Sequence, residues 1–137
     1  MREEREVLIH VRRGAEFLIT HRAPEGGGYW HVIAGGVDPG EAWQAAALRE
    51  LREETRLAAG TIEPLGEFTY TPETWELEAP RRRLGVTVHV RAFLVDVDHG
   101  WEPELNEEHD EYRWLPREEA AELLYWPEPA ALLRSLP

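Results

Sequence analysis

The sequence contains no cysteine and no lysine, and each absence removes a class of chemistry. Without cysteine there is no disulfide, no thiol nucleophile and no cysteine-ligated zinc site. Without lysine there is no Schiff-base mechanism and no P-loop, because both depend on a lysine side chain. All 15 basic residues are therefore arginines.

Asparagine, glutamine and methionine are almost as scarce, since Asn106, Gln44 and Met1 are the single examples. Few heat-labile residues, ten prolines and many glutamates and arginines are typical of proteins adapted to high temperature. A GC-rich genome would bias the composition in the same direction. We predict a thermophilic source, with codon bias as the alternative explanation.

Long hydrophobic runs are also missing, and no segment approaches the roughly 20 apolar residues that a membrane helix needs. The N-terminal segment alternates charged and aliphatic residues, which is not the pattern of a signal peptide. We therefore expect a cytoplasmic protein without a membrane partner. The net charge of −12 argues against a nucleic-acid duplex as a partner, because neutralising phosphates requires clustered cations. A small phosphorylated substrate stays compatible if divalent cations supply the positive charge.

The length of 137 residues, of which 42% are hydrophobic, predicts a single domain over 1–137. Apolar alternation and turn residues predict strands at 7–11, 17–20, 29–33, 61–70, 85–97 and 111–115. Helices are expected at 41–57, 116–124 and 127–136, and loops at 34–41 and 71–83, with residues 38–40 capping the first helix. Strands with a central and a terminal helix, without regular alternation, favour an α+β fold with a mixed sheet between helices.

The segment RELREETR, at 49–56, places Glu50, Glu53 and Glu54 within five positions of one helix. Successive helical residues turn by about 100°, so Glu50 and Glu54 lie about 40° apart and Glu53 shares their face. An all-oxygen patch suits a hard cation such as Mg²⁺ or Mn²⁺ better than zinc. A solvated acidic face is the alternative, because like charges at this spacing cost a helix only about 0.2–0.5 kcal/mol.

The glutamates belong to a longer pattern that begins at Gly35. Five residues separate Gly35 from a glutamate, and seven more precede the run Arg-Glu-Leu-x-Glu-Glu. This pattern resembles the signature of the Nudix hydrolases, which cleave nucleoside diphosphates linked to another moiety. The match covers 35–57 and fixes seven positions. Arg56 departs from it, because the family has a glycine there that ends the helix in a left-handed conformation.

The resemblance implies a Nudix α/β/α sandwich and a role for each matched residue. The metal ligands that it implies are the three clustered glutamates, Glu50, Glu53 and Glu54. Arg49 is expected to orient them through salt bridges, and Glu41 to support the first turn of the helix. Gly35 and Gly36 are expected to form a loop whose amides approach metal and phosphate, since no side chain blocks that approach. The catalytic set implied within this box is Glu53, Glu54 and Arg49.

A second family element, Glu-His-x-x-Tyr-x-Trp, runs from Glu108 to Trp114. It resembles a segment of the dihydroneopterin-triphosphate and dATP pyrophosphohydrolases and of the dinucleoside polyphosphate hydrolases. In the first of these branches the glutamate joins the metal shell, which implies that Glu108 is a catalytic metal ligand. His109 is expected to hydrogen-bond a turn, whereas Tyr112 and Trp114 alternate on a strand and are expected in the core.

Candidates for substrate binding lie outside the box. The segment before it also resembles the dihydroneopterin-triphosphate branch, which implies that Arg22 contacts phosphate, with an exposed strand end as the alternative. Tyr29 and Trp75 are candidates for stacking on a base, with packing as the alternative. The arginine run at 81–83 either holds a triphosphate or makes a loop soluble.

We predict a Mg²⁺- or Mn²⁺-dependent pyrophosphohydrolase that uses water to cleave a phosphoanhydride bond of a nucleoside triphosphate or a related nucleoside diphosphate derivative. The alternatives are a dinucleoside polyphosphate or ADP-ribose hydrolase and, from another class, a nucleotide-binding module without catalysis. The intact set of glutamates argues against the last alternative. Specificity resides in loops outside the box, so the substrate stays open. Six tryptophans in 137 residues suit a homodimer interface.

Overall fold

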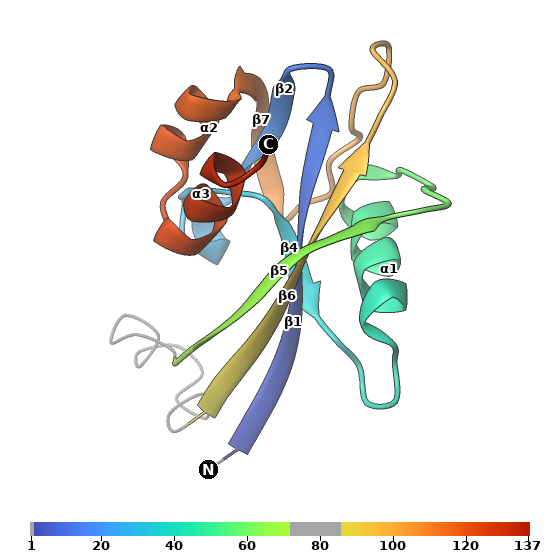
Figure 1. The fold of residues 1–137 in the computed structure, drawn as a ribbon, viewed down its shortest axis with the longest axis vertical. Coiled ribbons are helices and arrows are strands. Elements are labelled where there is room, and N and C mark those ends of the chain that lie inside the picture. Colours follow the sequence, from blue (N-terminus) through green and yellow to red (C-terminus); the bar gives the residue numbers. More distant parts are fainter. Residues whose placement is uncertain (1, 72–85) are drawn as a thin grey trace.

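A computed structural model describes residues 2–71 and 86–137, and across these ranges seven strands form one mixed sheet (Figure 1). The strands are β1 (Arg2–Arg13), β2 (Glu16–Arg22), β3 (Trp30–His31), β4 (Ile33–Gly36), β5 (Glu63–Tyr70), β6 (Val86–Asp96) and β7 (His109–Pro116). The helices are α1 (Trp43–Thr55), α2 (Arg117–Leu123) and α3 (Pro127–Arg134), with a 3-10 turn at Pro24–Gly26. The strand order is β3-β2-β1-β6-β5, and β4 also pairs with β1 and β7 with β2.

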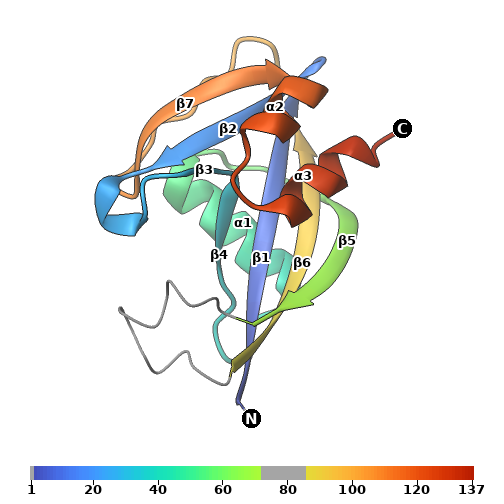
Figure 2. The ribbon, with the colours of Figure 1, turned by 90° about the vertical axis from the view of Figure 1, so that its left-hand side faces the viewer.

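Helices cover both faces of the sheet, with α1 on one face and α2 and α3 on the other (Figure 2). Strand β1 runs parallel to β6 and antiparallel to β2 and β4. Because side chains alternate along a strand, Val7 and Ile9 enter the core under α1, whereas Leu8 enters the core under α2 and α3. The predicted mixed sheet between helices is confirmed.

Strand β6 shows why the sequence at 85–97 is hydrophobic almost throughout. Val88 and Val90 are buried on the side of α2 and α3, and Phe93 and Val95 on the side of α1. From Ala92 to Val95 the strand is covered on both faces and needs no polar residue, whereas Thr87, His89 and Arg91 alternate with the buried valines and are half-buried or exposed.

The first strand was predicted at 7–11, but β1 begins five residues earlier, at Arg2, because the charged N-terminal residues pair with β6. The other predicted elements agree with the structure within two residues at each end, apart from the two regions described next.

The segment expected to be one strand at 29–33 followed by a loop is two strands. Strand β3 pairs with β2 through His31, and β4 pairs with β1. The chain changes partner at Val32, which is buried. Gly35 and Gly36 therefore lie in β4, opposite Val7 and Glu6, and the prediction of a glycine loop was wrong. Glycine-rich sequence favours loops locally, and here tertiary pairing overrides that preference.

Helix α1 is shorter than predicted at both ends. It begins after Ala42, which makes no side-chain capping bond, so the capping role expected of residues 38–40 was wrong. The turn itself is present, since the Glu41 amide donates to the Asp38 carbonyl at 3.0 Å and Gly40 has φ +79°. The sequence had left the effect of Arg56 on the helix end open; in the structure Arg56 ends the helix at φ 68° and is the single non-glycine residue with positive φ in the described ranges. No helix in these ranges is long and apolar enough to cross a membrane.

Candidate active site

Arg49, in the middle of α1, holds the acidic residues of the box together. Its Nε and Nη2 atoms donate to the two oxygens of Glu41 at 2.9 and 3.0 Å. Its Nη1 donates to Glu50 Oε1 at 2.9 Å and to Glu53 Oε1 at 3.4 Å, and its Nη2 also donates to the Gly36 carbonyl at 2.8 Å. The hydrogen bond from Arg49, followed by one from the backbone, lowers the pKa of Glu41 to about 2. The orienting role predicted for Arg49 has a geometric basis in these five bonds.

Gly35 and Glu50 show why a glycine occupies β4. A Cβ atom built on Gly35 would overlap the carboxylate of Glu50, with all three nearest contacts falling on that group. A Cβ on the adjacent Gly36 would meet nothing within 4 Å. Gly35 therefore makes the space in which the Glu50 carboxylate lies against the backbone of β4.

Glu54 lies on the same helix face but points into the protein. Its side chain is only 1% exposed, and its Oε1 atom lies 3.8 Å from the Nε2 atom of His109. Among the described residues neither Glu54 oxygen has a hydrogen-bond partner, and the same holds for both ring nitrogens of His109. Burial, and after it the charge of Arg22, lowers the pKa of His109 to about 4, so this histidine is neutral at pH 7. The sequence had predicted a histidine that hydrogen-bonds a turn. Among the described residues the ring makes no such bond, and only the backbone amide of His109 donates to the Asn106 carbonyl, at 3.3 Å.

The electrostatic surroundings of Glu54 are unfavourable for a negative charge. Burial, then the neighbouring Glu50 carboxylate and the charge of Glu108, raise the pKa of Glu54 to about 10, which Arg22 only partly opposes. A buried carboxylate between two others must carry a proton or share a cation. Oxygen donors of this kind fit a hard divalent cation.

The helical spacing had predicted that the carboxylates of the three helix glutamates meet at one point. In the structure they do not. Glu53 is 53% exposed and leans to Arg49, Glu50 lies over Gly35, and Glu54 is buried. Within residues 2–71 and 86–137, no three His, Asp or Glu side chains form a set that could hold a metal ion. The reason is that Arg49 draws two of the carboxylates to itself while the third packs inside.

A cavity of about 560 Å³ opens beside these residues, between the sheet and the start of α3. Four predicted residues line it: Arg22, Tyr29, Gly35 and Glu108. The Arg22 guanidinium is anchored by a bond from its Nε to the Gly26 carbonyl at 3.0 Å and lies 5.9 Å from the ring centre of Tyr29. A cation, an aromatic ring and acidic oxygens therefore share one hollow, as a phosphorylated aromatic ligand would require.

Aromatic residues that the sequence had not singled out complete this cavity. Trp126 lies 5.9 Å from Tyr29 and 4.9 Å from Tyr125, between ring centres, at nearly perpendicular angles to both. Phe68 and Tyr70 of β5 contribute to the lining. These side chains come from segments distant in sequence, so no local signal could have placed them together. Tyr112 and Trp114 are half-buried and pack on the α1 core, whereas Trp75 and the run at 81–83 lie outside the described residues.

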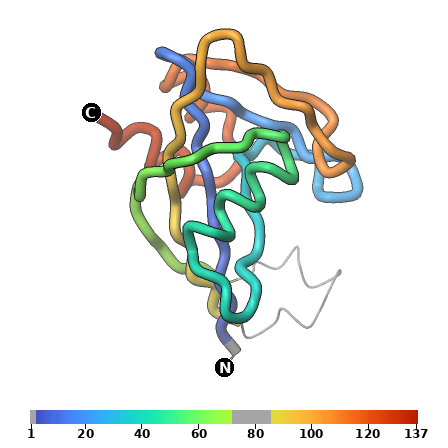
Figure 3. Tube along the Cα trace, turned by 90° about the vertical axis from the view of Figure 1, so that its right-hand side faces the viewer, coloured from blue at the N-terminus to red at the C-terminus, as the bar shows by residue number. Residues whose placement is uncertain are grey.

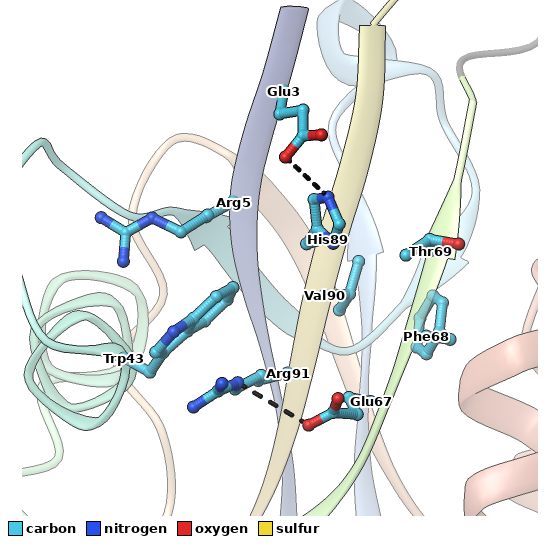
Figure 4. Close-up of a pocket in the computed structure, with 9 residues that line it drawn as sticks. All are labelled: Glu3, Arg5, Trp43, Glu67, Phe68, Thr69, His89, Val90 and Arg91. Atoms are coloured by element: carbon cyan, nitrogen blue, oxygen red, sulfur yellow. Dashed lines mark ion pairs between the residues drawn. The ribbon is translucent and has the colours of Figure 1, made fainter.

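A second hollow, of about 540 Å³, lies between α1 and strands β1, β5 and β6 and contains no predicted site residue (Figure 4). The Trp43 ring lies between two guanidinium groups, those of Arg5 at 5.2 Å and Arg91 at 4.6 Å. Arg5 also donates to the carbonyls of Asp38 and Glu41. Arg5 thus stabilises the turn that carries Glu41 and precedes α1.

The fold and the site together define an α/β/α architecture in which a glutamate-bearing helix packs on a glycine-containing strand beside a cavity lined by aromatic residues. The chain belongs to the Nudix family, since the NUDIX domain model matches residues 2–136. It is a Nudix hydrolase, and relatives named in this family hydrolyse pyrophosphate bonds.

Three known proteins illustrate the similarity. The mouse bis(5′-nucleosyl)-tetraphosphatase [asymmetrical] is 38% identical over 119 residues, which cover 87% of this chain and 76% of the mouse protein. A Myxococcus xanthus protein named octanoyltransferase is 36% identical over 124 residues. This chain covers 33% of that protein, about a third of its length. The structure of the E. coli dihydroneopterin triphosphate pyrophosphohydrolase superposes with a TM-score of 0.82 at 20% identity, covering 99% of this chain and 97% of that one. The last comparison concerns the fold alone.

Proposed function

We propose that this chain is a Mg²⁺- or Mn²⁺-dependent pyrophosphohydrolase that cleaves a phosphoanhydride bond of a nucleotide by attack of water. The observation that carries the proposal is the buried Glu54 carboxylate. It has no hydrogen-bond partner among the described residues and lies close enough to Glu50 and Glu108 for their charges to raise its pKa. Such a group destabilises the fold unless a cation accompanies it.

The residues that would hold the cation are three glutamates of α1 and one from the loop before β7: Glu50, Glu53, Glu54 and Glu108. When bound, a divalent cation neutralises phosphate charge and lowers the pKa of bound water. Arg49 keeps Glu50 and Glu53 oriented through its side-chain bonds. We assign the backbone of β4 at Gly35 and Gly36 to phosphate. Gly35 lines the cavity, and an alanine Cβ at Gly36 would meet nothing within 4 Å, so the backbone there would stay accessible.

We propose that Arg22 and Tyr29 contact different parts of the substrate in this cavity. Arg22 lies on the side of Glu54, since its charge opposes the rise of the Glu54 pKa, and we assign it to phosphate. Tyr29 forms an aromatic wall with Trp126, and we assign that wall to the base. A nucleotide seated this way directs its phosphoanhydride towards the carboxylates.

Hydrolysis requires a water oxygen to bond to phosphorus while the bridging P–O bond breaks and its electron pair leaves with the other phosphate. A carboxylate of the site accepts the proton that the water gives up. We propose Glu53, Glu54 and Glu108 as the candidates for this base. Glu53 and Glu108 have exposed side chains and can exchange protons with solvent.

Two substrate classes are in direct competition. We infer a nucleoside triphosphate from the sequence resemblance of the Glu108–Trp114 segment to the dihydroneopterin-triphosphate branch. A bis(5′-nucleosyl) tetraphosphate is supported by the 38% identity to the mouse enzyme. ADP-ribose is the third alternative. The products separate them, because only the first releases pyrophosphate, the second yields a nucleoside triphosphate, and the third yields AMP and ribose phosphate.

The test is a panel of nucleoside triphosphates, dinucleoside polyphosphates and ADP-ribose, incubated with Mg²⁺ or Mn²⁺ and separated by ion-exchange chromatography. We expect turnover of at least one member, abolished by a chelator. Glu53→Gln and Glu54→Gln should each reduce kcat by about 100-fold or more, since ligands of a catalytic cation are lost. Glu119→Gln, an exposed glutamate on α2, is the matched control and should leave kcat unchanged.

A folded sample without turnover of any member would overturn the proposal. Full activity in both Glu53→Gln and Glu54→Gln would overturn the assignment of the metal ligands. We further propose a single domain over 1–137, a cytoplasmic location, a heat-adapted source and a homodimer. Activity measured hot and at room temperature tests the third, and sedimentation velocity tests the last.

A further inference from the structure

The loop between β6 and β7 passes the C-terminal end of α1 (Figure 3) and is attached to it by a backbone hydrogen bond. The amide of Glu104 donates to the carbonyl of Thr55, the last residue of α1, at 3.0 Å. Further along, the Glu108 carbonyl accepts from the amide of Ala23 at 2.9 Å. The backbone on both sides of residues 105–107 is therefore fixed, and Asn106 lies between these two points.

Asn106 uses both ends of its side-chain amide. Its Nδ2 donates to the carbonyl of Glu53 at 3.2 Å and to Glu108 Oε2 at 3.3 Å. Its Oδ1 accepts from the amide of Glu108 at 3.0 Å. One side chain thus connects the helix that carries Glu53 and Glu54 to the carboxylate of Glu108.

We propose that Asn106 is the positioning residue that holds the Glu108 carboxylate against the end of α1, ready to bind a divalent cation together with the helix glutamates. The inference rests on the proposed function, because it assigns a purpose to Glu108 in that site. Without a donor, an exposed glutamate samples many rotamers, and the like charges of the site would push it into solvent. A bond from Nδ2 fixes one carboxylate oxygen and leaves the other available.

The three bonds require asparagine specifically. Aspartate would keep the acceptor for the Glu108 amide but would turn two donor contacts into oxygen–oxygen repulsions. Serine would also keep the turn, because its hydroxyl can accept from an amide two residues on, but it cannot reach both acceptors. Asn106 is also the single asparagine of the chain. These contacts require its side-chain amide, and neither aspartate nor serine can replace it.

The experiment compares Asn106→Asp and Asn106→Ser with wild type, alone and combined with Glu108→Gln. Kinetics are measured on the substrate found in the panel, and Mn²⁺ binding without nucleotide is measured by electron paramagnetic resonance. We expect both Asn106 variants to lower kcat by roughly 10- to 100-fold and to weaken Mn²⁺ binding by a similar factor, with little change in KM for the nucleotide. Added to Glu108→Gln, either change should have little further effect, because the carboxylate it positions is already gone.

Glu107→Gln is the matched control, since Glu107 is exposed, lies in the same loop and should leave both readouts unchanged. Wild-type kcat and Mn²⁺ affinity in both Asn106 variants, or effects that simply add to those of Glu108→Gln, would overturn the inference. If Asn106→Asp does not fold, Asn106→Ser decides by the same criteria. If wild type shows no turnover, the proposed function fails, and loss of Mn²⁺ binding in the variants still decides the positioning role.

Discussion

Among the described residues, Glu54 is the one glutamate of its cluster that forms no ion pair with an arginine. Arg49 donates to Glu50 at 2.9 Å and to Glu53 at 3.4 Å, whereas Glu54 faces a neutral histidine at 3.8 Å. The pKa of Glu54 is raised to about 10 from its ordinary value of 4.5, mainly by burial. At the residue scale, the position of Glu54 lowers the stability of the folded protein when its carboxylate is charged, and would be favourable beside a bound cation.

This cost predicts how stability changes with pH in the metal-free protein. Because the folded-state pKa of Glu54 lies above the unfolded value, the contribution of this residue to stability is fully present below about pH 4.5. It is lost progressively as the pH rises towards about 10. Glu54→Gln should therefore change the free energy of unfolding little at pH 5 and raise it by about 1–3 kcal/mol at pH 9.

Urea unfolding at pH 5, 7 and 9 in the presence of a chelator measures this difference. Glu53→Gln is the control, because that side chain is 53% exposed and should show no comparable rise. Parallel stability curves for wild type and Glu54→Gln would show that the buried carboxylate is not the source of the pH dependence.

At the scale of elements, the site depends on how closely α1 packs on β4. Gly35→Ala would place a methyl group on the Glu50 carboxylate, whereas Gly36→Ala on the same strand would meet nothing within 4 Å. Because a displacement of about 1 Å at a catalytic group can cost about 100-fold in rate, we expect Gly35→Ala to lower kcat by about that factor. Gly36→Ala should leave kcat within about twofold and stability unchanged or slightly improved.

Steady-state kinetics and urea unfolding of the two variants test this directly. A kcat of Gly35→Ala equal to that of Gly36→Ala would mean that Glu50 can move aside without consequence. Equal loss in both variants would point to the backbone of β4 and not to the Glu50 contact.

The same pair of elements shows what the sequence can and cannot predict. The period of the apolar residues located α1, whereas the effect of Arg56 in place of the family glycine stayed open until the structure showed its left-handed conformation. The glycines were predicted as a loop because their strand character comes only from pairing with β1. Likewise, helical spacing placed three glutamates on one face, but only packing decides that Glu54 turns inward while Glu53 stays exposed. Residue type and spacing are local properties, whereas burial is not.

At the scale of the whole molecule, the cavity is assembled from segments that no local pattern connects. Arg22 ends β2, Tyr70 ends β5, and Trp126 precedes α3, yet all three line one hollow. The sequence predicted Arg22 and Tyr29 through family resemblance, and it gave no indication of Trp126, which is brought to Tyr29 by the packing of α3. The sequence therefore predicted the fold in outline and the acidic residues of the site in part. Of the residues that line the cavity it predicted Arg22 and Tyr29 on one side and not Trp126 on the other.

That aromatic wall gives the last prediction, which concerns binding and not chemistry. An aromatic contact of this geometry contributes about 0.5–1.5 kcal/mol beyond burial. If the base of the substrate lies against Trp126, Trp126→Leu should therefore raise KM by about 2- to 10-fold with kcat nearly unchanged. Trp126→Phe keeps an aromatic face and should retain most of the affinity. Michaelis–Menten kinetics on the best substrate of the panel, with binding of a non-hydrolysable analogue measured by calorimetry, separate the two parameters. A fall in kcat at constant KM would place Trp126 in support of the fold around α3 and remove it from the base-binding wall.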